Sequence, residues 1–197
     1  KHTYTPDVKK DKPITVDSQY TIGLGGLIKC KHTFNYPEGL ADPPMLGMAM
    51  ATGEGFEELN WFGLGPIETY ADRKAGALVS EWDNLVTNEY FPYVLPQESG
   101  NHEDTRWFTL VNEEGKGFQI QAAKKPFGFS VRHYAVDDIT KCMHHNELTL
   151  CKETFVQINA IQRGLGTSSC GPDTLDKYKI KPGKYVLEYY ILPINEG

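Results

Sequence analysis

The sequence predicts an all-β protein, a sandwich or a barrel, on three observations. Glycine and proline, with 19 and 12 residues, recur about every ten positions and separate segments rich in β-branched and aromatic residues. Apolar and polar residues alternate in residues 118–122, and more loosely in 155–160, as in strands with one packed and one solvated face. Hydrophobic residues make up 40% of the 197, which is enough to fill the core of one sandwich domain.

The predicted elements follow one another as short strands. The first, residues 19–36, is expected to break at Gly25 and Gly26, because two glycines favour a turn. The strands that follow are predicted at residues 45–51, 59–62, 76–82, 105–111, 118–123, 127–134, 153–161 and 184–194. Residues 1–13 are expected to form an extended lead-in, and residues 195–197 a frayed end. The sequence has no internal repeat, so residues 1–197 are predicted to form a single domain.

The helical signal is weak and is strongest in residues 135–151. Asp137 and Asp138 would suit the first turn of a helix that ends near His144 and His145. A short helix and a broad loop both fit this segment.

The charge pattern argues against nucleic acid and membranes as partners. The net charge is −6, and the basic runs at residues 9–10 and 124–125 are too short for a phosphate-binding surface. No apolar stretch approaches the roughly 20 residues of a membrane-spanning helix. The first residues are polar and no methionine starts the chain, so we expect an excised piece of a longer protein.

The cysteines predict free thiols. They are Cys30, Cys142, Cys151 and Cys170. None lies in a C-x-x-C pair or at zinc-finger spacing from histidine. The adjacent His144 and His145 cannot chelate one metal ion together from a regular strand or helix. We therefore expect no metal site, and thiols that stay reduced in a reducing compartment.

The most specific motif lies at residues 61–73, which read WFGLGPIETYADR. They closely resemble the W-F/Y-G-x-G-P-x-E-x-Y-x-D-R signature of the C-terminal domain of β-galactosidases of glycoside hydrolase family 2. Residues 92–107 carry PY, PQESGN and TRW, which resemble a second segment of that domain. GLG at residues 164–166 and KPGKY at residues 181–185 resemble its last loop and closing strand. The resemblance therefore runs in order along nearly the whole chain.

This resemblance implies a two-sheet antiparallel β-supersandwich of the galactose mutarotase-like kind. It also implies that the chain is the C-terminal domain of a larger β-galactosidase, which hydrolyses terminal non-reducing β-D-galactosides with retention. The domain would pack against the catalytic (β/α) barrel and lend a loop to the rim of the sugar pocket. The resemblance further implies no cofactor for this chain, Mg and Na ions for the parent enzyme, and a cytoplasmic location in a bacterium.

The catalytic carboxylates are expected to lie outside this chain. Retaining hydrolysis uses two carboxylates about 5 Å apart, and the resemblance implies that both are glutamates of the barrel. A barrel needs about 250 residues with alternating helices, whereas this chain has 197 residues and little helical signal. Asn-Glu pairs end at Glu89, Glu113, Glu147 and Glu196, and all four are interpreted as polar surface pairs. No residue of the chain is therefore predicted to be catalytic.

Two segments are candidates for sugar contact, because sugar sites combine polar groups with an aromatic face. The candidates beside Trp107 are Asn101, His102 and Arg106. The candidates at the predicted pocket rim, in the loop at residues 164–172, are Ser168, Ser169 and Cys170. Well-known family members carry GGDDSW in this loop, whereas this sequence has no tryptophan there.

The motif at residues 61–73 is interpreted differently. Glu68, Asp72 and Arg73 follow a Gly- and Pro-rich turn, where charged side chains can reach backbone groups or each other. We expect a knot of ion pairs and hydrogen bonds that joins sheet to loop, in preference to direct sugar contact.

Two other functions stay open. A free-standing aldose 1-epimerase would need a general acid and a general base on one sheet face. The candidates are His102 or His144 with Glu147 or Glu153. A stand-alone carbohydrate-binding module would need an indole exposed in a groove, from Trp61, Trp82 or Trp107. The main interpretation buries Trp61, so the exposure of these indoles separates the possibilities.

Overall fold

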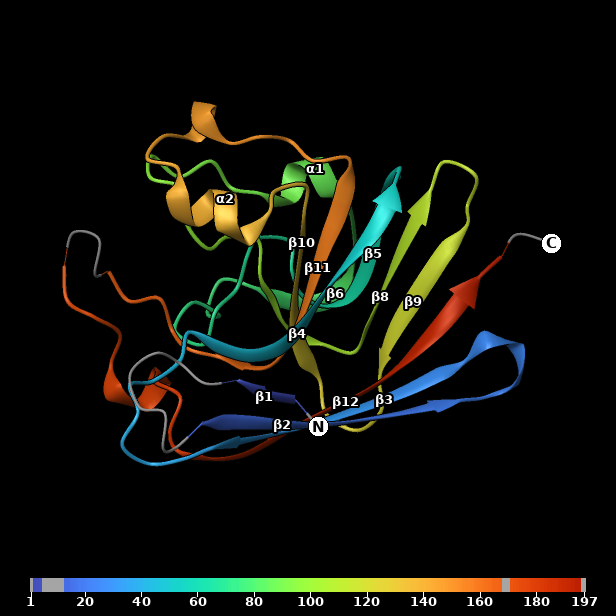
Figure 1. The fold of residues 1–197 in the computed structure, drawn as a ribbon. Helices are drawn as coiled ribbons and strands as arrows, with labels where there is room; N and C mark the ends of the chain where they lie inside the picture. The colour runs from blue at the N-terminus through green and yellow to red at the C-terminus, as the bar shows by residue number, and fades with distance from the viewer. Residues whose placement is uncertain (1, 5–12, 168–170, 196–197) are drawn as a thin grey trace.

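The protein is built from two packed antiparallel β-sheets (Figure 1). The structure, a computed structural model, describes residues 2–4, 13–167 and 171–195. The larger sheet has eight strands, in the order β1 (His2–Tyr4), β2 (Ile14–Ile22), β3 (Ile28–Tyr36), β12 (Gly183–Ile194), β9 (Gly117–Ala122), β8 (Trp107–Asn112), β5 (Phe56–Gly65) and β6 (Leu78–Leu85). The smaller sheet has the order β4 (Met45–Glu54), β11 (Glu153–Gln162), β10 (Phe127–Arg132) and β7 (His102–Thr105). The predicted all-β, two-sheet antiparallel fold is confirmed.

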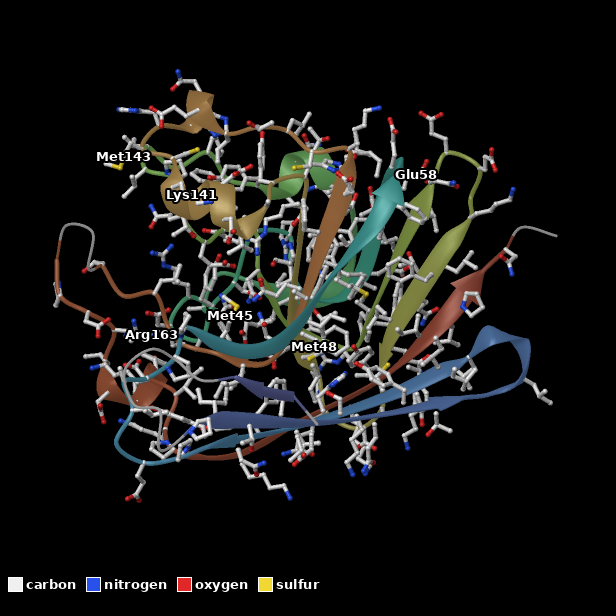
Figure 2. The ribbon with its side chains drawn as sticks, viewed as in Figure 1. Met45, Met48, Glu58, Lys141, Met143 and Arg163 are labelled. Atoms are coloured by element: carbon white, nitrogen blue, oxygen red, sulfur yellow. The ribbon has the colours of Figure 1, made fainter. Side chains whose placement is uncertain are left out.

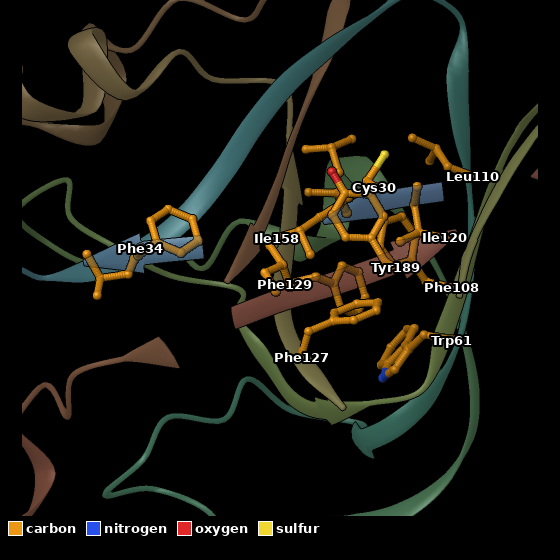
Figure 3. Close-up of a cluster of buried hydrophobic side chains, with 14 of the residues drawn as sticks. Cys30, Phe34, Trp61, Phe108, Leu110, Ile120, Phe127, Phe129, Ile158 and Tyr189 are labelled. Carbon is orange, nitrogen blue, oxygen red and sulfur yellow. The ribbon is translucent and has the colours of Figure 1, made fainter. Parts of the chain in front are cut away.

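Alternation along the strands builds one hydrophobic core between the sheets. In β3, Cys30 and Phe34 are buried, while Lys29 and Lys31 lie on the opposite, outer face. In the middle of the core, Phe108 of β8 stacks on Phe129 of β10, with ring centroids 4.4 Å apart (Figure 3). Facing side chains from both sheets therefore interdigitate, as in other sandwiches.

Each predicted strand overlaps a strand of the structure, although several bounds differ by two to five residues, and two strands were not predicted. Within the predicted lead-in, the structure describes residues 2–4, which form β1 against β2. Strand β7 was missed, because its sequence His-Glu-Asp-Thr has none of the apolar alternation that marks a strand. In the segment at residues 135–151, for which a short helix or a broad loop was expected, the structure has a short helix, α2 (Val136–Lys141), and a single 3-10 turn, η2, at His145–Glu147. Helix α1 (Val86–Glu89) was not predicted.

The described cysteines agree with the prediction of free thiols. Cys30 is buried, Cys142 and Cys151 are half-buried, and all three are unpaired. Burial raises the pKa of the Cys30 thiol, although a hydrogen bond with Tyr189 opposes this. Among the described residues, no helix is long and apolar enough to span a membrane.

Candidate functional site

The motif at residues 61–73 begins as an anchor in the core. Trp61 of β5 is only 1% exposed, and its Nε1 donates to the carbonyl oxygen of Leu64 over 3.1 Å. Its ring lies 4.3 Å from the ring of His102. The expectation that the fold buries Trp61 is confirmed.

The end of β5 packs too tightly for any side chain larger than hydrogen. A Cβ atom on Gly65 would lie 2.7 Å from the ring of Trp82, which covers this end of the strand. The indole of Trp82 is in turn held by a 3.2 Å hydrogen bond from its Nε1 to the carbonyl oxygen of Gly63. This contact fixes the point from which the following turn leaves the sheet.

Glu68 ties this turn to the segment at residues 91–100. Its carboxylate accepts hydrogen bonds from the Tyr93 hydroxyl, from the Tyr70 hydroxyl at 3.3 Å and from the N–H of Gly100 at 2.8 Å. Burial, together with the negative charges of Glu98 and Glu68, raises the pKa of Tyr70 well above its ordinary value. Tyr70 therefore stays a neutral hydrogen-bond donor.

Asp72 ties the same turn to a second loop. Its carboxylate accepts the N–H of Leu165 at 3.1 Å, the N–H of Gly166 at 2.8 Å and the hydroxyl of Thr174 at 3.0 Å. Burial raises the pKa of Asp72, but these hydrogen bonds outweigh burial and hold the pKa below its ordinary value. Arg73, the next residue, donates to the carbonyl oxygen of Gly166 at 3.4 Å.

These contacts confirm the predicted knot. The side chains of Glu68, Asp72 and Arg73 connect three chain segments that lie far apart in sequence. The guanidinium of Arg73 also lies 3.5 Å from the Tyr93 hydroxyl, and so closes the network between Asp72 and Glu68. The knot can therefore fix the position of two loops at one end of the sandwich.

The loop held by Asp72 is clamped at its base. Gly166 has a φ of 62°, and a Cβ atom there would lie 2.4 Å from the backbone nitrogen of Thr174. The N–H of Thr167 donates to the carbonyl oxygen of Pro172 over 3.1 Å. The predicted rim residues Ser168, Ser169 and Cys170 lie between these anchors and outside the described residues.

The other predicted sugar-contact residues lie in three different surroundings. Asn101 is fully buried, and its Nδ2 donates to the carbonyl oxygen of Thr69 at 2.8 Å. His102 is 1% exposed and faces the core, where its Nε2 lies 2.6 Å from the Glu89 carboxylate. The guanidinium of Arg106 lies 5.5 Å from the ring centre of Phe62. The structure does not bring the three side chains to one surface, and their sugar contact stays a prediction.

Glu89 corrects one sequence interpretation. It was read as part of a polar surface pair, yet it is buried and bonds both to His102 and to Asn84 Nδ2, the latter at 2.6 Å. A buried carboxylate needs such partners, because desolvation is costly. No local signal could identify it, because its partner in β7 lies 13 positions further along the chain.

The epimerase and the carbohydrate-binding module depend on the positions of particular histidines, glutamates and tryptophans. The side chain of His144 is 69% exposed and pairs with Glu147 at 2.8 Å, within one surface turn. Trp61 is buried, while Trp82 and Trp107 are half-buried. For the binding module, none of the three indoles is fully exposed. For the epimerase, His144 and Glu147 do pair, but at the η2 turn and not on a sheet face, and His102 bonds to Glu89.

The chain is an all-β sandwich domain of two packed sheets. Hydrogen bonds from Glu68, Asp72 and Arg73 hold two of its loops in position. Residues 1–191 match the family described as beta galactosidase small chain, and the chain belongs to this family.

Named relatives are much longer than this chain. It is 29% identical over 197 residues to the beta-galactosidase of Streptococcus thermophilus, covering 99% of this chain and 19% of the relative. It is 32% identical over 170 residues to beta-galactosidase BgaC of Bifidobacterium adolescentis, covering 83% of this chain and 16% of the relative. It is 29% identical over 189 residues to the beta-galactosidase small subunit of Latilactobacillus sakei, covering 90% of this chain and 59% of the relative. The chain thus spans less than a fifth of the first two relatives.

Proposed function

We propose that this chain is the small, non-catalytic part of a β-galactosidase that hydrolyses terminal non-reducing β-D-galactosides. The observation that carries the proposal is the match to the small-chain family along residues 1–191, in relatives of which the chain spans only a small share. The chain's partner is then the catalytic barrel of the same enzyme. The two carboxylates of retaining hydrolysis, about 5 Å apart, belong to that barrel.

The loop at residues 164–172 is proposed to border the sugar pocket. Its base is held by Asp72, Arg73 and Thr174, so the loop can be presented to another domain in one position. Ser168, Ser169 and Cys170 would then supply the rim. Asn101 and His102, being buried, are proposed to act by positioning the neighbouring loops.

The rim proposal is tested by Asp72→Asn in the intact enzyme. The substitution keeps the side-chain shape but weakens the acceptor for Leu165 and Gly166, so the loop loses its fixed position. We expect the KM for a nitrophenyl β-galactoside to rise about fivefold, with a smaller change in kcat, because the loop contributes binding and no chemistry.

A matched control is Asp176→Asn. This residue lies in η3 (Asp176–Tyr178), and its carboxylate pairs with Lys181 on the surface. Its loss should leave KM unchanged. If the KM of Asp72→Asn is also unchanged, the proposal that this loop borders the sugar pocket is wrong.

We also propose a cytoplasmic location. Three unpaired cysteines, Cys30, Cys142 and Cys151, fit a reducing compartment, in which disulfides are rare. Cell fractionation beside cytoplasmic and secreted marker proteins tests this proposal. Mg and Na ions, where the enzyme needs them, are proposed to bind outside this chain.

A further inference from the structure

A groove of about 600 Å³ lies on the outer face of the smaller sheet. It lies between β4, the segment at residues 95–98 and α2. Its apolar walls are Met45, Leu95, Pro96, Val136, Ile139 and Met143. Figure 2 shows Met45 at the start of β4 and Met143 just after α2.

The floor of this groove is polar and incompletely paired. Arg132 of β10 is 3% exposed, and its guanidinium donates to Gln157 Oε1 at 2.9 Å and to Glu98 Oε2 at 3.4 Å. Among the described residues, neither Arg132 Nε nor Glu98 Oε1 has a hydrogen-bond partner, although both atoms are buried. Leaving such groups unpaired is costly. An occupant that both accepts and donates hydrogen bonds would satisfy them once the two side chains turn toward the groove.

The rim of the groove is apolar and open. Leu95 is 44% exposed, Met143 64% and Val136 53%, which is unusual for three large apolar side chains around one groove. Among the described residues, those that form the groove walls have aliphatic and thioether side chains and no aromatic ring. A sugar would call for an aromatic platform. A peptide segment fits better, because it offers apolar side chains together with backbone C=O and N–H groups.

We infer that this groove docks a peptide segment of the larger, catalytic part of the β-galactosidase. An apolar side chain of that segment fills the groove, and its backbone satisfies Arg132 and Glu98. The inference rests on the proposed function. The chain covers only 19% of its Streptococcus thermophilus relative, so most of such an enzyme lies outside it and can cover the patch. A second copy of this chain fits less well, because a concave groove needs a protruding segment opposite it.

Thiol and methionine labelling of the intact enzyme and of the isolated chain tests this inference. Cys142 lines the groove, and Met143 stands at its rim, while Cys151 lies outside the groove lining. In the intact enzyme we expect alkylation of Cys142 and oxidation of Met143 to slow at least about tenfold relative to the isolated chain, because interface cores exclude water. The rate of alkylation of Cys151 should differ by less than about twofold between the intact enzyme and the isolated chain.

A substitution pair separates docking from general shielding. Val136→Asp places a charge at the exposed start of α2, where an acidic residue suits the helix, so the fold should persist. In the intact enzyme it should return Cys142 to nearly the reactivity of the isolated chain. The control, Val186→Asp, changes a side chain that is 44% exposed on β12 of the other sheet, and should leave Cys142 protected. Circular dichroism of both isolated variants checks folding.

The outcomes distinguish this inference from the proposed function. An intact enzyme that hydrolyses β-galactosides while Cys142 reacts as fast as in the isolated chain would overturn the docking site and leave the function standing. Protection of Cys142 in an enzyme without that activity would support docking and reject the function. Protection in the isolated chain, through dimer formation or added galactose, would assign the groove to a second copy or to a sugar and overturn the inference.

Discussion

Asp72 and Arg73 are adjacent, yet both reach the loop at residues 164–167. In a strand their side chains would point to opposite faces. Here the Tyr70–Arg73 bridge closes a turn, and the turn lets the carboxylate accept from Gly166 N–H while the guanidinium donates to Gly166 O. Two adjacent residues therefore bind both the backbone N–H and the backbone C=O of Gly166.

Whether a residue of this network can be predicted from the sequence depends on how far along the chain it lies from its partners. Trp61, Glu68 and Asp72 could be identified because the motif is contiguous and its Gly-Pro turn has a physical meaning. Thr174 could not, because it lies 102 positions from Asp72 and an isolated threonine carries no signal. Glu89 was misjudged for the same reason.

Trp61→Ala should destabilise the isolated chain by about 3–5 kcal/mol, as truncation of other buried aromatic residues does. The indole is buried against His102 and Phe129, and its removal leaves a cavity that neighbouring strands cannot close. Urea unfolding measures the loss. The control is Trp107→Ala, where the indole is only half-buried, and a smaller effect is expected. An unchanged free energy of unfolding for Trp61→Ala would contradict the role of this residue as a core anchor.

At the scale of the elements, the strands were predictable wherever one face packs and the other is solvated. Strands β3, β9 and β11 carry this alternation. Strand β7 does not, because its buried residues His102 and Thr105 are polar: His102 bonds to Glu89 of α1, and the Thr105 hydroxyl donates to the carbonyl oxygen of His102 within the strand. Helix α2 ends at Lys141, before the end near His144 and His145 that the sequence suggested, because an acidic first turn marks where a helix begins and carries no information on where it ends.

The loop at residues 164–174 should lose its clamp in acid. The pKa of Asp72 is depressed in the folded state, so its contribution to stability is present above the unfolded pKa of about 3.9 and is lost as pH falls through the folded pKa. The difference in unfolding free energy between the wild type and Asp72→Asn should therefore be largest near neutral pH and shrink below about pH 4.

Chemical denaturation at a series of pH values measures this difference. Glu113→Gln is the control, because this exposed side chain lies in the turn between β8 and β9 and should show no such narrowing. A difference that grows as the pH falls would show that Asp72 does not act as an ionised acceptor for this loop.

At the scale of the whole molecule, the two sheets share one core, and the knot and the groove lie outside it. The isolated chain should accordingly bind galactose only weakly, with a dissociation constant above roughly 1 mM. The physical reason is that the described base of the rim loop offers backbone groups and Thr167, with no indole to stack on a sugar. Calorimetric or NMR titration measures this affinity. Saturable micromolar binding would favour a stand-alone carbohydrate-binding module.

The most direct test of the account is reconstitution of β-galactosidase activity from parts. The isolated chain and the remaining, larger part of the enzyme are purified separately, then assayed alone and together on a chromogenic β-galactoside. We predict no turnover by the isolated chain, little by the larger part alone, and recovery of activity on mixing. Turnover by the isolated chain that disappears on replacing one of its own glutamates, or full activity of the larger part without it, would contradict the account.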